Sequence, residues 1–196
     1  MLVKDLIKQV NSMPDSWVRV EEIRKIPTGL ELCIAVHKTR RGRKVETWRI
    51  RCLRVREFKI EDVDGGGFDI YATTHPAARQ FVAPQASLRW TGSDDKVIET
   101  VGAIYHAHVD TVDDWISFDR YLEARLISGK KFVRGPAFLL RAYAKALRAI
   151  GMKTQLTSRK NKGRVKMARP KVLHFGSSSV VADQFAVEPS AIDPKR

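Results

Sequence analysis

The chain has 196 residues, 43% of them apolar, and a formal net charge of +14 at pH 7. This length suffices for one compact domain of about 100 to 150 residues plus an appendage, and the charge predicts attraction to polyanions such as nucleic acid. We expect neither a signal peptide nor a membrane span, because charged residues interrupt the apolar N-terminus and no run of about 18 apolar residues occurs.

The first 60 residues predict a helix followed by an antiparallel meander. Apolar residues recur at spacings of three and four over residues 2–10, which is typical of a short amphipathic helix. Strands are predicted over residues 17–26, 30–38 and 44–60. In the third strand the apolar alternation changes phase near Cys52 and Leu53, so we expect a β-bulge there.

The following residues predict a mainly helical region. The predicted elements are a short helix at 75–81, a strand at 86–91, and helices at 94–112, 114–128 and 136–150. Pro136 suits the first turn of the last helix, and Gly151 suits its end. Periodicity is lost after Gly151, so residues 152–196 are interpreted as an extended arm with a short strand at 172–175.

Together these elements predict an α+β fold, with an antiparallel meander packed by helices, then an amphipathic helix and a basic C-terminal arm. The expected boundaries are 1–151 for the domain, with the meander at about 17–60 and the helical part at about 94–151, and 152–196 for the arm and tail.

Charge is distributed unevenly along the chain. Residues 124–182 contain fifteen Lys or Arg and no Asp or Glu. Such a segment is expected to contact phosphates by releasing counterions. The candidate nucleic-acid-binding residues are Arg141, Lys145 and Arg148 on one side of the last helix, and Lys153, Arg159, Lys160, Lys162, Arg164, Lys166, Arg169 and Lys171 in the arm. The other reading of the arm is a solvated tail.

A second basic group lies in the meander. Its candidate residues are Arg40, Arg41, Arg43 and Lys44 at the tip of the second hairpin. Arg49, Arg51, Arg54 and Arg56 continue this stripe along the third strand. Such a ribbon could follow phosphates. The alternative is that acids of the same region, Glu21, Glu22, Glu31, Glu46 and Glu57, neutralise it.

One cluster suggests metal chemistry. His106, His108 and Asp110, with Asp113 and Asp114 nearby, are residue types that bind zinc or related ions. On a helix, however, residues two apart point about 200° away from each other, so the two imidazoles could not share one ion. The alternative is that His108 faces the core with a hydrogen-bond partner.

Other catalytic signatures are weak. The sequence has no nucleophile elbow, Walker motif or dinucleotide fingerprint, so no cofactor is expected. Cys33 and Cys52 could face each other across paired strands or serve as a nucleophile with His37, although thiols in a sheet are more often buried and inert. Reduced thiols favour a cytoplasmic protein, or one associated with a nucleoid or nucleus.

The leading functional hypothesis is therefore a non-enzymatic, accessory or regulatory nucleic-acid-binding protein that contacts the phosphate backbone through its basic arm. The first alternative is a toxin-neutralising or assembly protein whose acidic partner protein accepts the arm. The second is a metal-dependent hydrolase that uses His106 and Asp110 with Asp113 or Asp114. The choice between DNA and RNA, and the oligomeric state, stay open at this level.

Overall fold

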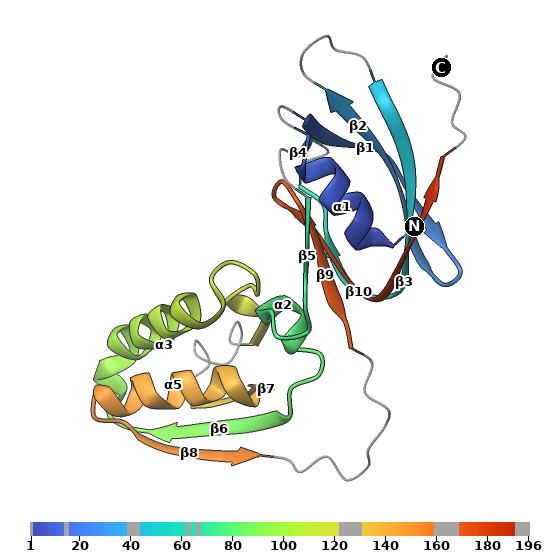
Figure 1. Ribbon diagram of the computed structural model, residues 1–196. Coiled ribbons are helices and arrows are strands. Elements are labelled where there is room, and N and C mark those ends of the chain that lie inside the picture. Colours follow the sequence, from blue (N-terminus) through green and yellow to red (C-terminus); the bar gives the residue numbers. More distant parts are fainter. Residues whose placement is uncertain are drawn as a thin grey trace. The chain divides into compact units, whose positions relative to one another are not determined.

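The computed structural model describes residues 2–13, 16–38, 44–61, 64–65, 68–121, 131–158 and 169–190. The chain forms two compact units (Figure 1). Unit 1 combines residues 1–78 with residues 168–196, and unit 2 is formed by residues 79–167. The chain thus leaves unit 1, builds unit 2 and returns, which differs from the expected division at residue 151.

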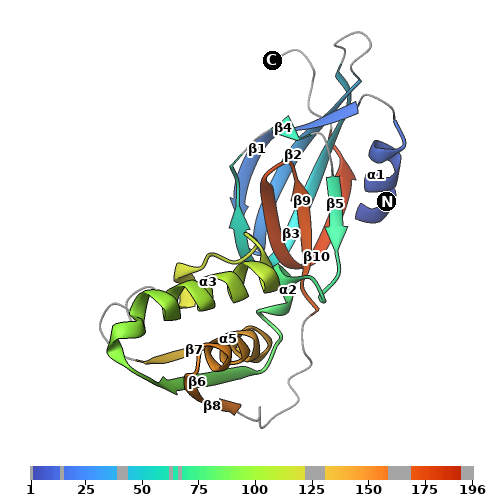
Figure 2. The same cartoon turned by 90° about the vertical axis from the view of Figure 1, so that its left-hand side faces the viewer.

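Unit 1 is built on a seven-stranded antiparallel sheet, which curves strongly (Figure 2). Its strands follow the order β4-β1-β2-β3-β10-β9-β5. Their bounds are β1 Ser16–Ile26, β2 Gly29–Lys38, β3 Lys44–Lys59, β4 Asp64–Gly65, β5 Phe68–Tyr71, β9 Lys171–Phe175 and β10 Ser178–Pro189. The predicted meander is confirmed as β1, β2 and β3.

The predicted N-terminal helix is confirmed as α1, Val3–Asn11, which buries its apolar side against the sheet. Leu6 and Val10 lie in one core with Leu32 and Ile34 of β2, because alternate residues of a strand project to the same face. The opposite face of the sheet carries the intervening residues of these strands, including Glu31. The same alternation therefore produces the core of unit 1 and a second, polar face.

The predicted bulge at Cys52 and Leu53 is wrong in position. Both residues keep an unbroken register with β2 and with β10. The phase change occurs one residue later, at Arg54, whose φ is 54° and whose N–H donates to the carbonyl oxygen of Thr28 at 2.8 Å. Val55 then packs against the core again. The inserted residue lies slightly further along β3, because Val55 pairs with Ala182 and Glu57 with Val181, which leaves Arg56 as the extra residue opposite β10.

The predicted C-terminal arm is largely replaced by strands. Residues 153–158 form β8 of unit 2, whereas β9 and β10 belong to the sheet of unit 1. β10 lies between β3 and β9, and Val180, Ala182 and Val187 enter the core. The prediction of a strand at 172–175 is confirmed by β9. Long-range pairing, which sequence periodicity does not reveal, orders this segment.

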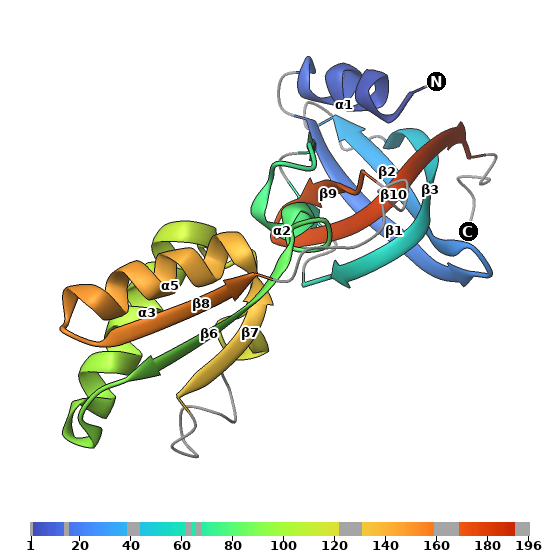
Figure 3. The same cartoon turned by 90° about the horizontal axis from the view of Figure 1, so that it is seen from below.

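Unit 2 is a three-stranded antiparallel sheet covered by helices on one face (Figure 3). The strand order is β7-β6-β8. The bounds are α2 Pro76–Arg79 at the junction of the units, β6 Gln85–Thr91, the 3-10 turn η2 Asp94–Lys96, α3 Val97–Val112, β7 Phe132–Pro136, α5 Ala137–Ala149 and β8 Lys153–Ser158. The α+β fold with antiparallel sheets packed by helices is confirmed.

The core of unit 2 explains why the helices lie on one face only. Ala86, Leu88 and Trp90 of β6 are buried, and they pack with Leu140 and Leu147 of α5. The predicted helices at 94–112 and 136–150 are confirmed, with Pro136 immediately before α5. The one predicted at 114–128 is wrong at its start, because residues 113–118 are not helical and residues 122–130 lie outside the described part.

Among the residues that the structure describes, no helix has the length and apolar character needed to cross a bilayer.

Candidate nucleic-acid interface

The face of the three-stranded sheet that lies opposite the helices is polar and basic. Residues paired directly across antiparallel strands project to the same side. Arg89 of β6 pairs with Phe132 on one side and Gln155 on the other, and Thr91 pairs with Lys153. We call this surface the open sheet face, which consists of Gln85, Ser87, Arg89, Thr91, Phe132, Arg134, Lys153, Gln155 and Thr157.

Three cations cross the open sheet face on a diagonal. Arg134 pairs with Ser87, two residues before Arg89, and Lys153 pairs with Thr91, two residues after it. From the usual strand spacing and rise, each diagonal step between Cα atoms is about 8 Å. All three side chains are exposed. Long flexible side chains at this spacing can reach several phosphates of one polynucleotide.

An aromatic ring lies between two of these cations. The Cζ atoms of Arg89 and Arg134 are 5.4 Å and 5.2 Å from the centroid of the half-buried Phe132 ring. Both distances are within cation–π range. A planar ring flanked by guanidinium groups is a surface on which a nucleic-acid base can stack while its phosphates meet the charges.

Acidic residues of unit 2 are confined to one region of its sequence. The unit carries 17 Lys or Arg and eight Asp or Glu. Every one of the eight acids lies between Asp94 and Glu123, in α3 and the residues around it. The three strands and α5 have none. The sheet therefore has a positive potential that no acid of its own strands reduces.

The predicted cationic side of α5 is present. Arg141, Lys145 and Arg148 are exposed. Neither they nor Arg89, Arg134 and Lys153 form an ion pair with any residue that the structure describes. These six cations are available to a partner.

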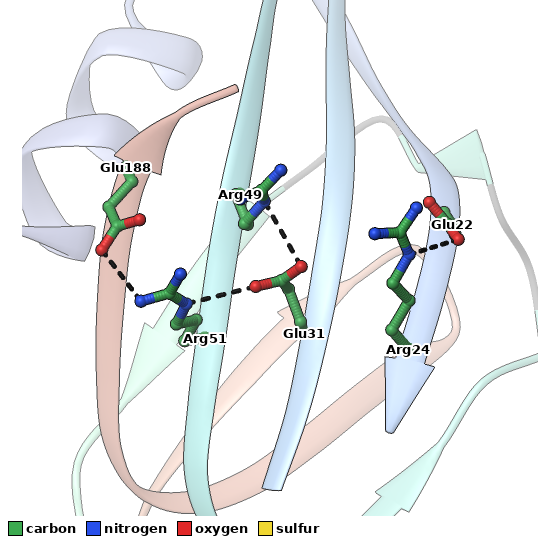
Figure 4. Close-up of polar contacts among 6 residues, drawn as sticks. All are labelled: Glu22, Arg24, Glu31, Arg49, Arg51 and Glu188. Carbon is green, nitrogen blue, oxygen red and sulfur yellow. Dashed lines mark hydrogen bonds and ion pairs between the residues drawn. The ribbon is translucent and has the colours of Figure 1, made fainter. Parts of the chain in front are cut away.

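The arginines of β3 have a different environment. On the polar face of the unit 1 sheet, Glu31 accepts a hydrogen bond from Arg51 Nε at 3.1 Å and forms an ion pair with Arg49 Nε at 3.3 Å (Figure 4). Arg51 Nη1 also donates to Glu188 at 3.2 Å. Only 9% of the Glu31 side chain is exposed. Figure 4 also shows Arg24 paired with Glu22 on β1.

The remaining two arginines of that strand share a second carboxylate. Arg56 forms a two-point contact with Asp183, Nε–Oδ1 at 3.2 Å and Nη2–Oδ2 at 3.0 Å, and Arg54 Nε lies 3.3 Å from the same Oδ2. The Asp183 side chain is 2% exposed. We call Arg49, Arg51, Arg54 and Arg56 with Glu31, Asp183 and Glu188 the paired arginine face. Its three carboxylates offset three of the four arginine charges, and only Glu31 of these acids was expected from the sequence.

The candidate residues of the predicted arm are divided between the two units. Lys153 lies in unit 2, whereas the exposed Arg169 and Lys171 lie in unit 1, just before and at the start of β9. The other predicted binding residues lie outside the described part of the chain: Arg159, Lys160, Lys162, Arg164 and Lys166, and Arg40, Arg41 and Arg43. Lys44 begins β3, with its side chain outside the described part.

The histidines of α3 point in different directions, as the helical reading predicts. His106 is exposed and His108 is 1% exposed. His108 Nε2 lies 2.5 Å from the carbonyl oxygen of Ile116, and Nδ1 lies 2.6 Å from the Tyr143 hydroxyl. Because a carbonyl only accepts, Nε2 carries the proton and Nδ1 accepts from Tyr143. Burial lowers the pKa of His108 and favours this neutral form.

The predicted role of His108 as a core residue with a hydrogen-bond partner is thus confirmed. Within the described ranges no cluster of His, Cys, Asp or Glu has the geometry to hold a metal ion. His106 and His108 lie on different sides of α3, so they could not contribute to one site.

The two cysteines are free and buried. Cys33 pairs with Arg49 and Cys52 with Leu30, so they do not face each other across β2 and β3. Burial raises the pKa of Cys52 to about 12, which leaves its thiol protonated and unreactive at neutral pH.

Sequence reasoning missed Arg89, Arg134 and Phe132. The alternation of Ala86, Leu88 and Trp90 does indicate that Arg89 projects to the other face of its strand. Residues 129–135, however, fall between two predicted helices. No strand was therefore predicted that would bring Phe132 and Arg134 beside Arg89.

Comparison of the chain with protein-family models, with curated proteins and with solved structures finds no match.

Proposed function

We propose that this protein is a non-enzymatic nucleic-acid-binding protein that contacts the phosphate backbone through the basic surface of unit 2. The observation that carries the proposal is the open sheet face, where Arg89 and Arg134 flank Phe132, Lys153 continues the diagonal of cations, and the three strands have no acid. Cations without an acidic partner can neutralise phosphates and so release the counterions that are condensed on the nucleic acid, which favours binding.

The composition of the open sheet face favours a polynucleotide over an acidic protein. Protein interfaces have a hydrophobic centre from which charged residues are depleted. Phe132 is the one large apolar side chain of this face, and it lies between two arginines. A base can stack on that ring, whereas an acidic protein surface would find little apolar area to bury.

The basic segment 159–166 extends the proposed surface in sequence. It begins directly after β8, whose Lys153 belongs to the open sheet face, and it contains Arg159, Lys160, Lys162, Arg164 and Lys166. The exposed cations of α5 are the second extension. The arm hypothesis is therefore retained for these residues, joined to a folded basic surface rather than to a free C-terminal tail.

The test compares two variants that lose the same charge. In the first, Arg89→Gln, Arg134→Gln and Lys153→Gln are combined. In the control, Arg19→Gln, Arg24→Gln and Lys25→Gln are combined on the exposed part of β1. Binding of labelled single-stranded and duplex DNA and RNA is measured by fluorescence anisotropy over a salt series.

We expect the first variant to lose about thirtyfold in affinity at low salt and the slope of log K against log salt to decrease by about 2 to 3. The control should change affinity by about twofold at most, because its cations are distant in sequence and mostly paired with acids. No salt-sensitive binding by the unmodified protein, together with copurification of one acidic protein, would instead support the assembly-protein alternative.

A further inference from the structure

Helix α3 carries an exposed apolar stripe that the nucleic-acid surface does not use. Four of the seven large hydrophobic residues that are exposed in the described part lie on this one helix: Val97, Ile98, Tyr105 and Val109. Ile98 is 88% exposed and Tyr105 is 48% exposed. Clustering of this kind on a single element marks an interaction surface.

The stripe follows one side of the helix. Ile98, Gly102, Tyr105 and Val109 are separated by four, three and four residues, which keeps them within about 60° of one another around the helix axis. The buried residues of α3, such as Ile104 and His108, lie on a different side, against the core of unit 2. We call the four residues the α3 stripe.

No contact within the described structure requires a glycine at position 102, near the centre of the α3 stripe. A Cβ atom built there would have nothing within 4 Å. Glycine inside a helix costs about 1 kcal/mol relative to alanine. Its absent side chain is therefore not needed by the described fold, but it would permit the close approach of another helix.

We propose that the α3 stripe pairs with the same stripe of a second copy of this chain, with the two helices antiparallel about a two-fold axis. The spacing of four, three and four residues is the same in both directions along the helix. In this register Ile98 of each copy meets Val109 of the other, and Tyr105 meets Gly102. The largest side chain of the stripe thus falls opposite the position that has none, on both sides of the axis.

The antiparallel arrangement agrees with the electrostatics of the helix. It places each positive helix terminus near the negative terminus of the other copy. Glu99 and Asp110 lie about 100° around α3 from the stripe, at the rim of the contact. In a two-fold pair Asp110 of each copy approaches Glu99 of the other, whose charge is partly offset by Lys96 at 3.6 Å, so added salt should strengthen the dimer only slightly.

The size of the contact sets its expected strength. Eleven residues of helix rise separate Ile98 from Val109, so the stripe is about 16 Å long. A single helix pair of this length forms a small contact, at the lower end of specific interfaces, so we expect a weak dimer with a dissociation constant on the order of 10 µM. The contact leaves the open sheet face of each copy free and gives the pair two basic surfaces.

The first experiment measures sedimentation of the full chain from about 1 µM to about 500 µM, at low and high salt. We expect a monomer–dimer equilibrium that Gly102→Leu and Ile98→Ser each weaken at least tenfold. Gly102→Leu is informative because it fills open space and improves helix propensity, so a loss of dimer cannot be attributed to unfolding. Ile23→Ser, at a similarly apolar exposed site on β1, is the control that should leave the equilibrium unchanged.

The second experiment tests the register. Ile98→Cys combined with Val109→Cys should form an intermolecular disulfide under mild oxidation, whereas Ile98→Cys alone should not, because its two copies are about 16 Å apart along the helices. Cys33 and Cys52 are buried and should not compete. A monomer throughout the concentration range, or equal cross-linking by the single and double variants, would overturn the proposal.

Discussion

The two sheets of this protein both present arginine to solvent, but only one of them supplies carboxylates beside it. On the paired arginine face, Glu31, Asp183 and Glu188 hold the four arginines of β3. On the open sheet face, Arg89 and Arg134 have an aromatic ring between them and no acid on any of the three strands. The same residue type thus contributes to the fold in unit 1 and is free to bind in unit 2.

The two faces differ in whether their arginines are held by buried carboxylates or are solvated. Asp183 and Glu31 are almost fully covered, so each would be costly to leave without its arginines. This cost favours the conformations in which the arginines of β3 stay paired with these carboxylates. The cations of unit 2 are solvated and pay little to exchange water and counterions for phosphate. A count of basic residues along the sequence does not separate these two situations.

The largest effect on binding should come from the cations that follow β8. Combined substitution of Arg159, Lys160, Lys162, Arg164 and Lys166 by Gln should lower nucleic-acid affinity by about 100-fold or more and reduce the salt slope by about 4. Anisotropy titrations measure both. Substitution is used because a deletion of residues 152–196 would also remove β8, β9 and β10. Unchanged affinity would leave the folded surface alone as the binding site.

Removing acids from unit 1 should make its arginines as available as those of unit 2. Glu31→Gln, Asp183→Asn and Glu188→Gln together should release the arginines of β3 and raise affinity for nucleic acid about tenfold at low salt. The same variant should be less stable by about 1 to 3 kcal/mol in urea unfolding, because the covered carboxylates of Glu31 and Asp183 are replaced by amides that lack the charge-assisted contacts with arginine.

Its matched control is Asp5→Asn with Glu21→Gln and Asp69→Asn, which removes the same charge from exposed acids of unit 1 that form no ion pair with a described arginine. If both triple variants gained affinity to the same extent, total charge rather than released arginine would be responsible.

Phe132 should affect the binding of single strands more than the binding of duplexes. Phe132→Ala should lower affinity for single strands about tenfold and leave duplex binding within about twofold, because only unpaired bases can stack on the ring. Phe58→Ala removes an exposed phenylalanine from unit 1 and should leave both affinities unchanged. Competition between labelled single strands and unlabelled duplex measures the ratio. An equal loss for both ligands would indicate that Phe132 supports the strand rather than stacking.

The smallest effect on binding should come from the core of unit 2, which affects stability instead. The pKa of His108 is lowered by burial, whereas an unfolded histidine titrates near pH 6.5. Below about pH 6.5 the unfolded state binds more protons, so stability is complete above that pH and falls as pH decreases through it. His108→Gln can donate to Ile116 and accept from Tyr143 without titrating.

We therefore expect His108→Gln to reduce the acid sensitivity of unit 2, measured as amide hydrogen exchange in α3 and α5 between about pH 5 and pH 7. The exposed His106→Gln is the control, and it should retain the pH dependence of the unmodified protein. An equal response of both variants would show that His108 is not the titrating group.

Much of the local structure followed from the sequence. The period of three to four around Leu6 and Val10 predicted α1, and the alternation in β1, β2 and β3 predicted the meander. These elements are specified by residues close in the chain. The predicted bulge lies a few residues later than expected, with a left-handed backbone at Arg54 and the extra residue of β3 at Arg56, because the apolar alternation shows that the phase changes but not at which residue.

The candidate site was predicted only in part. The exposed cations Arg141, Lys145 and Arg148 were read from helical spacing, and Lys153 from the acid-free segment. Phe132 and Arg134 were placed in a loop, since β7 is short and ends in Gly135 and Pro136, both unusual inside strands. Only the pairing of β7 with β6 brings them beside Arg89.

By itself, then, the sequence determined the elements with a clear period and the concentration of positive charge in residues 124–182. Tertiary structure alone decided which basic residues of the chain are available to a partner. It brought β10 back beside β3, so that Asp183 and Glu188, more than 120 residues away in the chain, neutralise the arginines of unit 1. Charge neutralisation depends on distance in space, and strand pairing across such separations leaves no local pattern in the sequence.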